Sequence, residues 1–252
     1  MTTTVAVVGA TGKLGQIVTR IVDEADDFTL GARLNSASPL EDMLGADLVV
    51  DVSTPAASHG IVDFAVGHGL NVLVGTSGWT GERILSLETR VAAHPGVGVL
   101  IVPNFSVGSV IGTTLATLAA RFFDSIEIVE AHSASKIDSP SGTAVRTAEL
   151  IGVARGRLGP VIAPHTDQRA RGQQVSSIPI HSLRLQGLLA RQDVVFGGTG
   201  ETLTISHVTQ SGSSYESGIL LALRAANQAS GVTVGLDKLL GLDILIPSGI
   251  AP

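Results

Sequence analysis

The sequence predicts an α/β fold, in which a doubly wound parallel sheet is followed by an α+β region with a mostly antiparallel sheet. Three observations support this prediction. Short apolar runs alternate with helix-length segments over the first ~105 residues, which is typical of parallel strands covered by helices. A glycine-rich turn follows the first apolar run. Beyond Pro103, several segments alternate apolar and polar residues, as strands with one wet face do.

The first part of the chain is expected to contain five strands with helices between them. The strands are Val5–Val8, Thr29–Arg33, Leu48–Asp51, Asn71–Val74 and Val97–Ile101. The helices are Gly12–Ala25, Ala57–His68 and Gly81–His94. Each crossover is long enough for a right-handed βαβ unit, so this part is expected to form one doubly wound domain.

The second part is expected to mix helices and strands. Helices are predicted near Val107–Phe122 and Ser141–Ala154. Strands are predicted near Ser125–Ala131, Val175–Leu183, Leu188–Phe196 and Glu201–Val208. A last apolar helix, roughly Tyr215–Ala229, could pack on either part, because periodicity alone does not decide its place.

Composition limits the classes of function. The 252 residues are 44% hydrophobic, which suffices for one or two packed domains. Sixteen basic and 22 acidic residues give a net charge of −6, which disfavours nucleic acid or an anionic membrane as the main partner. The chain has no cysteine, which excludes disulfides, thiolate metal sites and cysteine nucleophiles. The N-terminal Met-Thr-Thr-Thr runs straight into a strand, which predicts a cytoplasmic protein.

The first strand-to-helix turn reads Gly9-Ala10-Thr11-Gly12-Lys13-Leu14-Gly15, a variant of the dinucleotide-binding fingerprint of Rossmann domains. Small residues let the backbone approach a pyrophosphate, and a helix N-terminus offers free amides. A glycine triplet can also mark a merely tight turn. Its place in a βαβαβ pattern favours nucleotide binding. The expected cofactor-binding residues of this turn are Gly9, Thr11, Gly12, Lys13, Leu14 and Gly15.

The end of the second strand bears on the choice of cofactor. An acid there would bind the ribose 2′-hydroxyl of NAD, but the stretch Gly31–Ser38 contains none. Arg33, helped by Asn35, Ser36 and Ser38, could instead meet a 2′-phosphate, which favours NADPH over NADH. The alternative is that Arg33 is a solvated surface charge.

Three further loops follow later strands, at the edge where a doubly wound sheet binds its ligand. They are expected to surround a nicotinamide. Their residues are Ser53, Thr54 and Pro55, then Gly75, Thr76 and Ser77, and finally Asn104, Phe105 and Ser106.

The segment from Glu130 to Thr143 carries the richest chemistry. Ser139 is predicted to cap a helix whose first residue is Pro140. Ser141, Gly142 and Thr143 would then present amides and hydroxyls to an anion. His132 is a candidate general acid, and Lys136 is a candidate ammonium for a carboxylate or a protonated leaving nitrogen. Singly, such residues are more often solvated, so the prediction depends on their combination with the helix start.

The other histidines do not predict a metal site. His181 and His207 lie in expected strands and are interpreted as packed or hydrogen-bonded residues. The remaining histidines show no metal-ligand spacing and no carboxylate cluster beside them: His59, His68, His94 and His165.

The glycine-rich turn and the three later loops are accompanied by the strings EAHSASKIDSPSGTA, IHSLR, FGGTGETLTISH and GLDKLLGL. Together these motifs make nearly the whole chain similar to one known family. It resembles the dihydrodipicolinate reductases, also called 4-hydroxy-tetrahydrodipicolinate reductases, of the diaminopimelate and lysine pathway. The resemblance implies a cytoplasmic oxidoreductase that reduces a cyclic unsaturated imine dicarboxylate with NADH or NADPH. It also implies a homotetramer built by the sheets of the C-terminal domains.

The same resemblance implies a division of the chain and roles for single residues. Residues 1–106 and 215–252 would form the dinucleotide-binding domain, and residues 107–214 the substrate-binding and oligomerisation domain. His132 would be the proton donor and Lys136 a second acidic or substrate-binding group. Ser141, Gly142 and Thr143 would bind a substrate carboxylate, while Gly75 to Ser77 and Asn104 to Ser106 would border the nicotinamide.

The sequence departs from the family pattern at a few positions. Ser133 stands where the family usually has a second, substrate-binding histidine. Gly212 lies near the place of a usual arginine, and Leu185 and Gln186 replace a glycine pair. These changes remove donors suited to a dianionic substrate, although Ser133 can still contact it.

Three functions therefore stay open. The first is reduction of the family's own substrate, a small carboxylated imine. The second is reduction of a less charged or bulkier cyclic imine, which Leu185 and the lost charges would favour. The third is non-catalytic nucleotide binding, which the retention of His132 and Lys136 argues against. No nucleic-acid partner, membrane partner or metal is expected.

Overall fold

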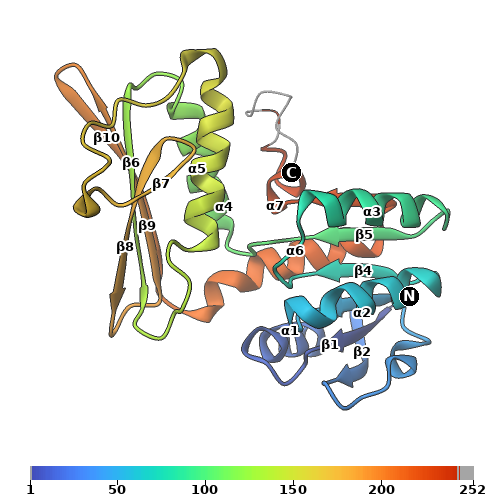
Figure 1. Ribbon diagram of the computed structural model, residues 1–252. Coiled ribbons are helices and arrows are strands. Elements are labelled where there is room, and N and C mark those ends of the chain that lie inside the picture. Colours follow the sequence, from blue (N-terminus) through green and yellow to red (C-terminus); the bar gives the residue numbers. More distant parts are fainter. Residues whose placement is uncertain (1, 243, 245–252) are drawn as a thin grey trace. The chain divides into compact units, whose positions relative to one another are not determined.

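The computed structural model describes residues 2–242 and residue 244 (Figure 1). The chain divides into two compact units, of which one contains residues 2–107 and 215–240 and the other residues 108–214. The predicted fold class is confirmed, since one unit holds a parallel sheet and the other a mostly antiparallel sheet. None of the helices in the described part of the chain is long and apolar enough to cross a membrane.

The first unit is built on a six-stranded sheet in the order β11-β5-β4-β3-β1-β2, with all strands parallel. The strands are β1 (Thr3–Val8), β2 (Phe28–Leu34), β3 (Leu48–Asp51), β4 (Asn71–Val74), β5 (Gly98–Ile101) and β11 (Gly231–Val234). Strands β3 and β5 are buried at every position, because helices cover both faces. The direction of strand addition reverses between β1 and β3, which is the switch point where such sheets bind ligands.

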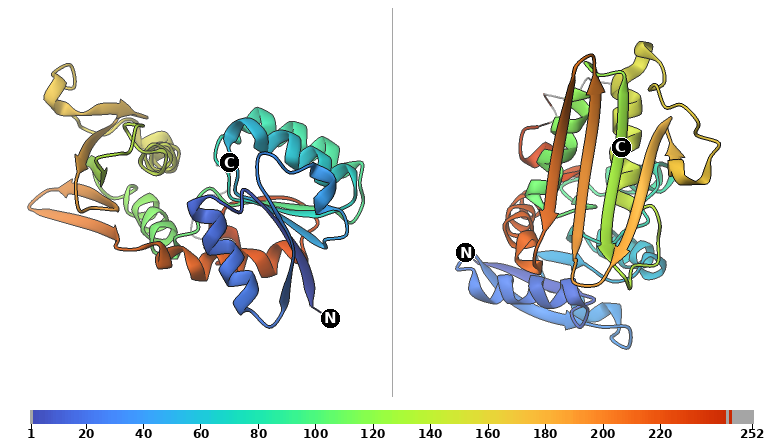
Figure 2. Two further views of the ribbon diagram at one scale, coloured as in Figure 1. Left: turned by 90° about the horizontal axis from the view of Figure 1, so that it is seen from below. Right: turned by 90° about the vertical axis from the view of Figure 1, so that its left-hand side faces the viewer.

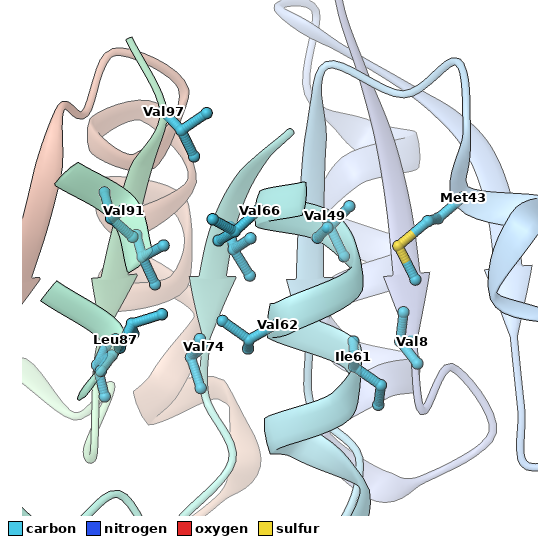
Figure 3. Packing of buried hydrophobic residues seen from close by; sticks show 14 of the residues in the cluster. Val8, Met43, Val49, Ile61, Val62, Val66, Val74, Leu87, Val91 and Val97 are labelled. Atoms are coloured by element: carbon cyan, nitrogen blue, oxygen red, sulfur yellow. The ribbon is translucent and has the colours of Figure 1, made fainter. Parts of the chain in front are cut away.

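Helices α2 and α3 pack on one face of this sheet, and α1 and α6 pack on the other (Figure 2, left). The helical elements are α1 (Lys13–Glu24), η1 (Leu40–Met43), α2 (Pro55–Gly67), α3 (Gly81–Ala92), α6 (Glu216–Asn227) and α7 (Leu236–Leu239). Figure 3 shows Val62 and Val66 of α2 beside Val49 and Val74 of the sheet. Each such fully buried side chain contributes about 1.5–3 kcal/mol to folding.

Helix α6 settles a point that periodicity left open, because it belongs to the first unit. Its buried residues Ile219, Ala222, Leu223 and Ala226 form one helical face, and the helix packs on β4 and β5. Gly218 is required for this approach, since a Cβ there would overlap the carbonyl oxygen of Phe105.

The second unit has a five-stranded sheet in the order β10-β9-β6-β8-β7, in which only the β6 and β8 pair is parallel. Its strands are β6 (Ser125–Ser133), β7 (Gln173–Val175), β8 (Ile178–Leu185), β9 (Ala190–Gly198) and β10 (Glu201–Thr209). Its helical elements are α4 (Val107–Ala119), α5 (Gly142–Arg155), η2 (Gly156–Leu158), η3 (Arg169–Arg171) and η4 (Gly212–Tyr215). Helices α4 and α5 lie behind the sheet in Figure 2, right, so both cover the same face, and the described residues leave most of the front face open.

The strands differ from expectation at two places. The predicted single strand Val175–Leu183 is a hairpin of β7 and β8, because Ser176 and Ser177 turn the chain with φ values of 49° and 69°. Strand β11 was not expected, since its four residues Gly231–Val234 are too short to show a period.

Candidate active site

The loops predicted to bind a cofactor lie at one edge of the first unit. Because the strands are parallel, the turns after β1, β2, β3, β4 and β5 all leave the sheet at its carboxyl edge. The structure therefore places at this edge the loops that contain Gly9, Ser53, Gly75 and Asn104, together with Arg33 near the end of β2.

The three glycines of the first turn have different tasks. Gly9 has a φ of 88°, and a Cβ on it would lie 2.5 Å from the carbonyl oxygen of Val52. A Cβ on Gly15 would overlap the carbonyl oxygen of Gly9, so this glycine lets α1 pack close to the turn. Gly12 is the N-cap residue of α1 and supplies no capping side chain, which leaves first-turn amides to a ligand. This geometry suits a pyrophosphate.

Arg33 is exposed at the end of β2, and its guanidinium already has a partner. It donates to the carboxylate of Asp23 on α1 at 2.8 Å. Asn35 and Ser38 bond within their own turn, where Asn35 Oδ1 accepts from the Ala37 amide and Ser38 Oγ accepts from the Asn35 amide. Arg33 is therefore the residue of this stretch whose charge could move to a 2′-phosphate.

The fully buried carboxylate of Asp51 ties the next two loops together, and the sequence did not reveal this role. Its Oδ1 accepts from the amide and hydroxyl of Ser53 at 3.1 and 2.5 Å, and its Oδ2 accepts from the hydroxyl of Ser58. Trp79 Nε1 donates to Ser58 Oγ at 3.0 Å. Asp51 thus connects the loop after β3, helix α2 and the loop after β4.

The loops after β4 and β5 pack against each other. A Cβ on Gly75 would lie 2.6 Å from Cε2 of Phe105, so any larger residue would have to displace that ring. Phe105 and Ser106 are buried, and the Ser106 amide donates to Asn104 Oδ1 at 2.9 Å. The side chains of Phe105 and Ser106 therefore pack beneath the loop, and they expose little surface that a ligand could contact.

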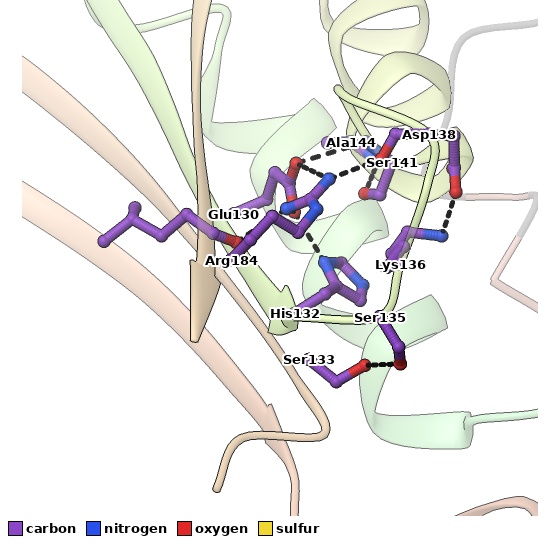
Figure 4. A network of polar contacts seen from close by, with 10 residues as sticks. Glu130, His132, Ser133, Ser135, Lys136, Asp138, Ser141, Ala144 and Arg184 are labelled. Carbon is purple, nitrogen blue, oxygen red and sulfur yellow. Dashed lines mark hydrogen bonds and ion pairs between the residues drawn. The ribbon is translucent and has the colours of Figure 1, made fainter. Parts of the chain in front are cut away.

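The candidate catalytic histidine lies near the end of β6 in the second unit. His132 Nδ1 is 2.5 Å from Glu130 Oε2, and the imidazole is 18% exposed (Figure 4). Strand alternation points Glu130 and His132 to the same side as Ile126 and Ile128, the side covered by α4 and α5. The ring is thus held at one nitrogen and partly accessible.

Glu130 and Arg184 form the centre of this network, although the sequence singled out neither. Arg184 donates to both carboxylate oxygens, from Nη1 to Oε2 at 3.0 Å and from Nη2 to Oε1 at 2.9 Å. Burial acts to raise the pKa of Glu130, but hydrogen bonds from Arg184, Ser182 and His132 and the Arg184 charge outweigh it and hold the pKa below its usual range. Glu130 is therefore ionised and acts only as an acceptor.

The start of α5 differs from the prediction that Ser139 caps the helix. Ser141 is the N-cap residue, since its backbone is extended and its hydroxyl accepts from the Ala144 amide at 3.2 Å. Pro140 lies before the helix, after a cis peptide bond. Ser141 is also buried and donates its own amide to Glu130 Oε1 at 3.2 Å. The accessible part of the helix start is therefore Gly142 and Thr143.

Lys136 lies in the loop between β6 and α5, with its Nζ 2.8 Å from Asp138 Oδ1. The hydrogen bond from Lys136 is the main reason why the pKa of Asp138 is lowered. Arg184 Nη2 also donates to the Asp138 carbonyl oxygen at 2.5 Å. The loop that carries Lys136 is thus attached to the same arginine that holds Glu130.

The departures from the family pattern fall at two places in the second unit. Ser133 and Leu185 are cross-strand partners at the ends of β6 and β8, and the Ser133 hydroxyl lies 3.0 Å from that of Ser135. Gln186 follows β8, and Gly212 begins η4. Strand alternation points Ser133 and Leu185 to the sheet face opposite that of His132, so they form one local change at the end of this strand pair.

Two other histidines have structural surroundings. His181 Nε2 lies 2.7 Å from Glu127 Oε2, and burial lowers the pKa of His207. A Cβ on Gly108 of α4 would lie 2.9 Å from the His207 ring, so that ring packs against the helix.

Comparisons with known proteins agree in both units. Family models described as "Dihydrodipicolinate reductase, N-terminus" and "Dihydrodipicolinate reductase, C-terminus" match residues 3–105 and 108–240. A 4-hydroxy-tetrahydrodipicolinate reductase of Clavibacter sepedonicus is 68% identical over 96% of this chain and 88% of that protein. One of Streptomyces griseus subsp. griseus is 45% identical over 95% of this chain and 98% of that protein. A dipicolinate-bound dihydrodipicolinate reductase from Paenisporosarcina sp. TG-14 is similar with a TM-score of 0.80 and 27% identity, over 94% of this chain and 99% of that one.

Proposed function

Because the chain belongs to the dihydrodipicolinate reductase family, we propose that it reduces 4-hydroxy-tetrahydrodipicolinate to tetrahydrodipicolinate in lysine and diaminopimelate biosynthesis. It is an oxidoreductase that uses a nicotinamide cofactor. One observation of the structure carries the proposal. The Glu130 carboxylate touches both His132 and the amide of Ser141, so a proton donor and an anion-binding helix start lie within the span of one side chain.

The carboxyl edge of the first unit would hold the cofactor. The first-turn amides after Gly12 would bind the pyrophosphate, and the loops that contain Ser53, Gly75 and Asn104 would border the nicotinamide. The turn fits a pyrophosphate, because it is closely packed and has room only for glycine at Gly9 and Gly15, which leaves its backbone accessible. When bound, the reduced nicotinamide supplies the hydride.

The second unit would bind the substrate and supply the proton. Gly142 and Thr143 at the N-terminus of α5 would bind one carboxylate by their amides and the helix dipole. The Lys136 ammonium would leave Asp138 and pair with a carboxylate of the substrate, whose negative charge it would offset. His132 would donate the proton from Nε2, since Nδ1 is held by Glu130.

We propose that NADPH is preferred over NADH. Arg33 offers a positive charge at the end of β2, where NAD-specific domains place an acid. Its present partner Asp23 is exposed, so the ion pair can exchange for a 2′-phosphate at small cost.

We also propose a cytoplasmic homotetramer. Strand alternation places the exposed side chains Leu183, Leu185 and Val208 on the face of the second sheet opposite α4 and α5. Apolar residues gathered on an open sheet face favour burial against another copy of the chain. Placement in the cytoplasm is supported by the relatives named 4-hydroxy-tetrahydrodipicolinate reductase, since such biosynthetic enzymes typically work there.

A divergent imine reductase and a non-catalytic nucleotide-binding protein are not favoured, because relatives at 68% and 45% identity are named as the reductase. The test is steady-state oxidation of NADPH and NADH with freshly generated 4-hydroxy-tetrahydrodipicolinate, beside a neutral cyclic imine. We expect kcat/KM of at least ~10⁴ M⁻¹s⁻¹ on the dicarboxylate. Turnover confined to the neutral imine would replace this function by the divergent one.

A further inference from the structure

Glu130 is a buried negative charge whose described partners are all hydrogen-bond donors. Its side chain is 0% exposed. Oε2 receives His132 Nδ1 at 2.5 Å and Arg184 Nη1 at 3.0 Å, and Oε1 receives Arg184 Nη2 at 2.9 Å and the Ser141 amide at 3.2 Å. Burial of an unpaired charge is costly. The Glu130 carboxylate is therefore stable in this position only because these donors surround it, and it fixes their positions in turn.

We propose that Glu130 is a positioning residue of the reductase, which sets the tautomer and direction of His132 and fixes the spacing between His132 and the start of α5. Arg184 acts with it, because it donates to both carboxylate oxygens and offsets their charge. This inference deepens the proposed function and rests on it for the catalytic consequence only. The arrangement of the three side chains stands independently of any substrate.

The tautomer follows from the chemistry of the contact. An ionised carboxylate cannot donate, so the proton in the short contact belongs to His132 Nδ1. Nε2 is then the nitrogen that gives a proton to a substrate when the ring is charged and accepts one when it is neutral. A carboxylate behind a catalytic histidine has this same orienting task in the serine protease triad.

The second oxygen of the same carboxylate extends this control to the substrate carboxylate site. Oε1 accepts from the Ser141 amide, and Ser141 is the N-cap residue of α5. The position of the Gly142 and Thr143 amides relative to His132 therefore depends on one rigid, fully buried group. Arg184 strengthens the link, since its Nη2 also donates to the carbonyl oxygen of Asp138 in the intervening loop.

Replacement of Glu130 by glutamine should expose this role. An amide has the size of the carboxylate but presents an NH₂ group on one side, and each side of Glu130 faces donors only. If the NH₂ group faces His132, the ring must change tautomer to accept at Nδ1. If it faces Ser141, the amide of the N-cap residue loses its acceptor.

The chain offers a matched control in Glu127. This glutamate lies on the same strand, is partly buried, and also joins a histidine and an arginine, namely His181 and Arg171. Strand alternation points it to the opposite face of the sheet from Glu130. Glu127→Gln therefore removes a similar charge from a similar network without touching His132.

The experiment compares wild type, Glu130→Gln and Glu127→Gln. ¹⁵N NMR of the imidazoles reports the tautomer of His132, and steady-state assays report kcat and KM with NADPH. We expect Nδ1–H in wild type and Glu127→Gln, and a smaller fraction of that form in Glu130→Gln, because the amide NH₂ group can face His132. We expect kcat of Glu130→Gln to fall by ~10- to 1,000-fold with NADPH affinity unchanged, and Glu127→Gln to stay within about twofold of wild type.

Two outcomes would overturn the proposal: an Nε2–H tautomer in wild type, or a Glu130→Gln variant with wild-type kcat. The wild-type spectrum needs no substitution, so the proposal remains testable even if Glu130→Gln does not fold. It also needs no substrate. Failure of the proposed function would appear instead as absence of wild-type turnover with the Nδ1–H tautomer intact.

Discussion

The guanidinium of Arg33 lies 2.8 Å from the carboxylate of Asp23, and the two side chains are 57% and 47% exposed. An ion pair with this exposure contributes about 0–1 kcal/mol, because water screens both charges. The Arg33 guanidinium is therefore held beside α1 only weakly by Asp23. A 2′-phosphate with two negative charges would compete well for the same guanidinium.

The first prediction follows from this pair. Arg33→Ala should weaken NADPH binding by ~10-fold or more and leave NADH binding unchanged, because a charge-assisted contact contributes ~1.5–3 kcal/mol. Asp23→Asn is the companion variant and should keep or improve NADPH affinity, since it frees Arg33. Fluorescence titration of both cofactors measures these affinities. Equal NADPH and NADH affinities in wild type would contradict the assignment.

Asp51 supports the second prediction. Asp51→Asn should lower both cofactor affinity and the free energy of unfolding, the latter by ~1–3 kcal/mol, because an amide cannot accept from Ser53 and Ser58 on both sides. Asp47→Asn is the control, since Asp47 accepts from the Thr4 amide at the start of β3, at the opposite edge of the sheet. Urea unfolding and cofactor titration of both variants separate the two effects. Equal losses in the two variants would refute a special role for Asp51.

The third prediction concerns acid stability. Hydrogen bonds and nearby cationic groups hold the pKa values of Glu127 and Glu130 below their usual range, against the effect of burial. An unfolded glutamate titrates at about 4.3, so the stabilisation is complete above that pH and is lost as pH falls toward the folded pKa values. We expect the free energy of unfolding to decrease from about pH 5 downward. The Glu127→Gln and Glu130→Gln variants should show a shallower decrease. A slope equal to that of wild type would mean that these groups do not control it.

Much of the first unit could be predicted, because its strands are apolar runs and its helices have regular spacing. The glycine turn is a local signal, and the structure explains Gly9 and Gly15 by close backbone contacts. The start of α5 was predicted less well. Ser139 and Ser141 both suit an N-cap, and only the tertiary bond from the Ser141 amide to Glu130 decides between them.

Glu130 and Arg184 could not be paired from sequence, since 54 residues separate them. One signal was present. Ile126, Ile128 and Glu130 occupy alternate positions of β6, so the period of two puts a charge on the buried face. A charge in that place requires a partner, and the partner's identity becomes visible only when β8 lies beside β6.

The fourth prediction concerns assembly. Leu185→Glu should convert the proposed tetramer to smaller species, because it places a charge on the open sheet face. Leu85→Glu is the matched control, since Leu85 is 66% exposed on α3 in the first unit. Light scattering coupled to size exclusion measures the mass of each variant. A wild-type monomer, or a tetramer that persists in Leu185→Glu, would contradict this assignment of the interface.

The most direct test of the central claim follows the hydride itself. Wild type and His132→Gln are supplied with 4-hydroxy-tetrahydrodipicolinate and with NADPH that carries deuterium in place of both hydrogens at C4 of the nicotinamide, and the product is examined by mass spectrometry. We predict that wild type forms tetrahydrodipicolinate that carries the deuterium. His132→Gln should form the same product ~100- to 10,000-fold more slowly, with unchanged NADPH affinity. Unlabelled product from wild type, or His132→Gln working at the wild-type rate, would contradict the account.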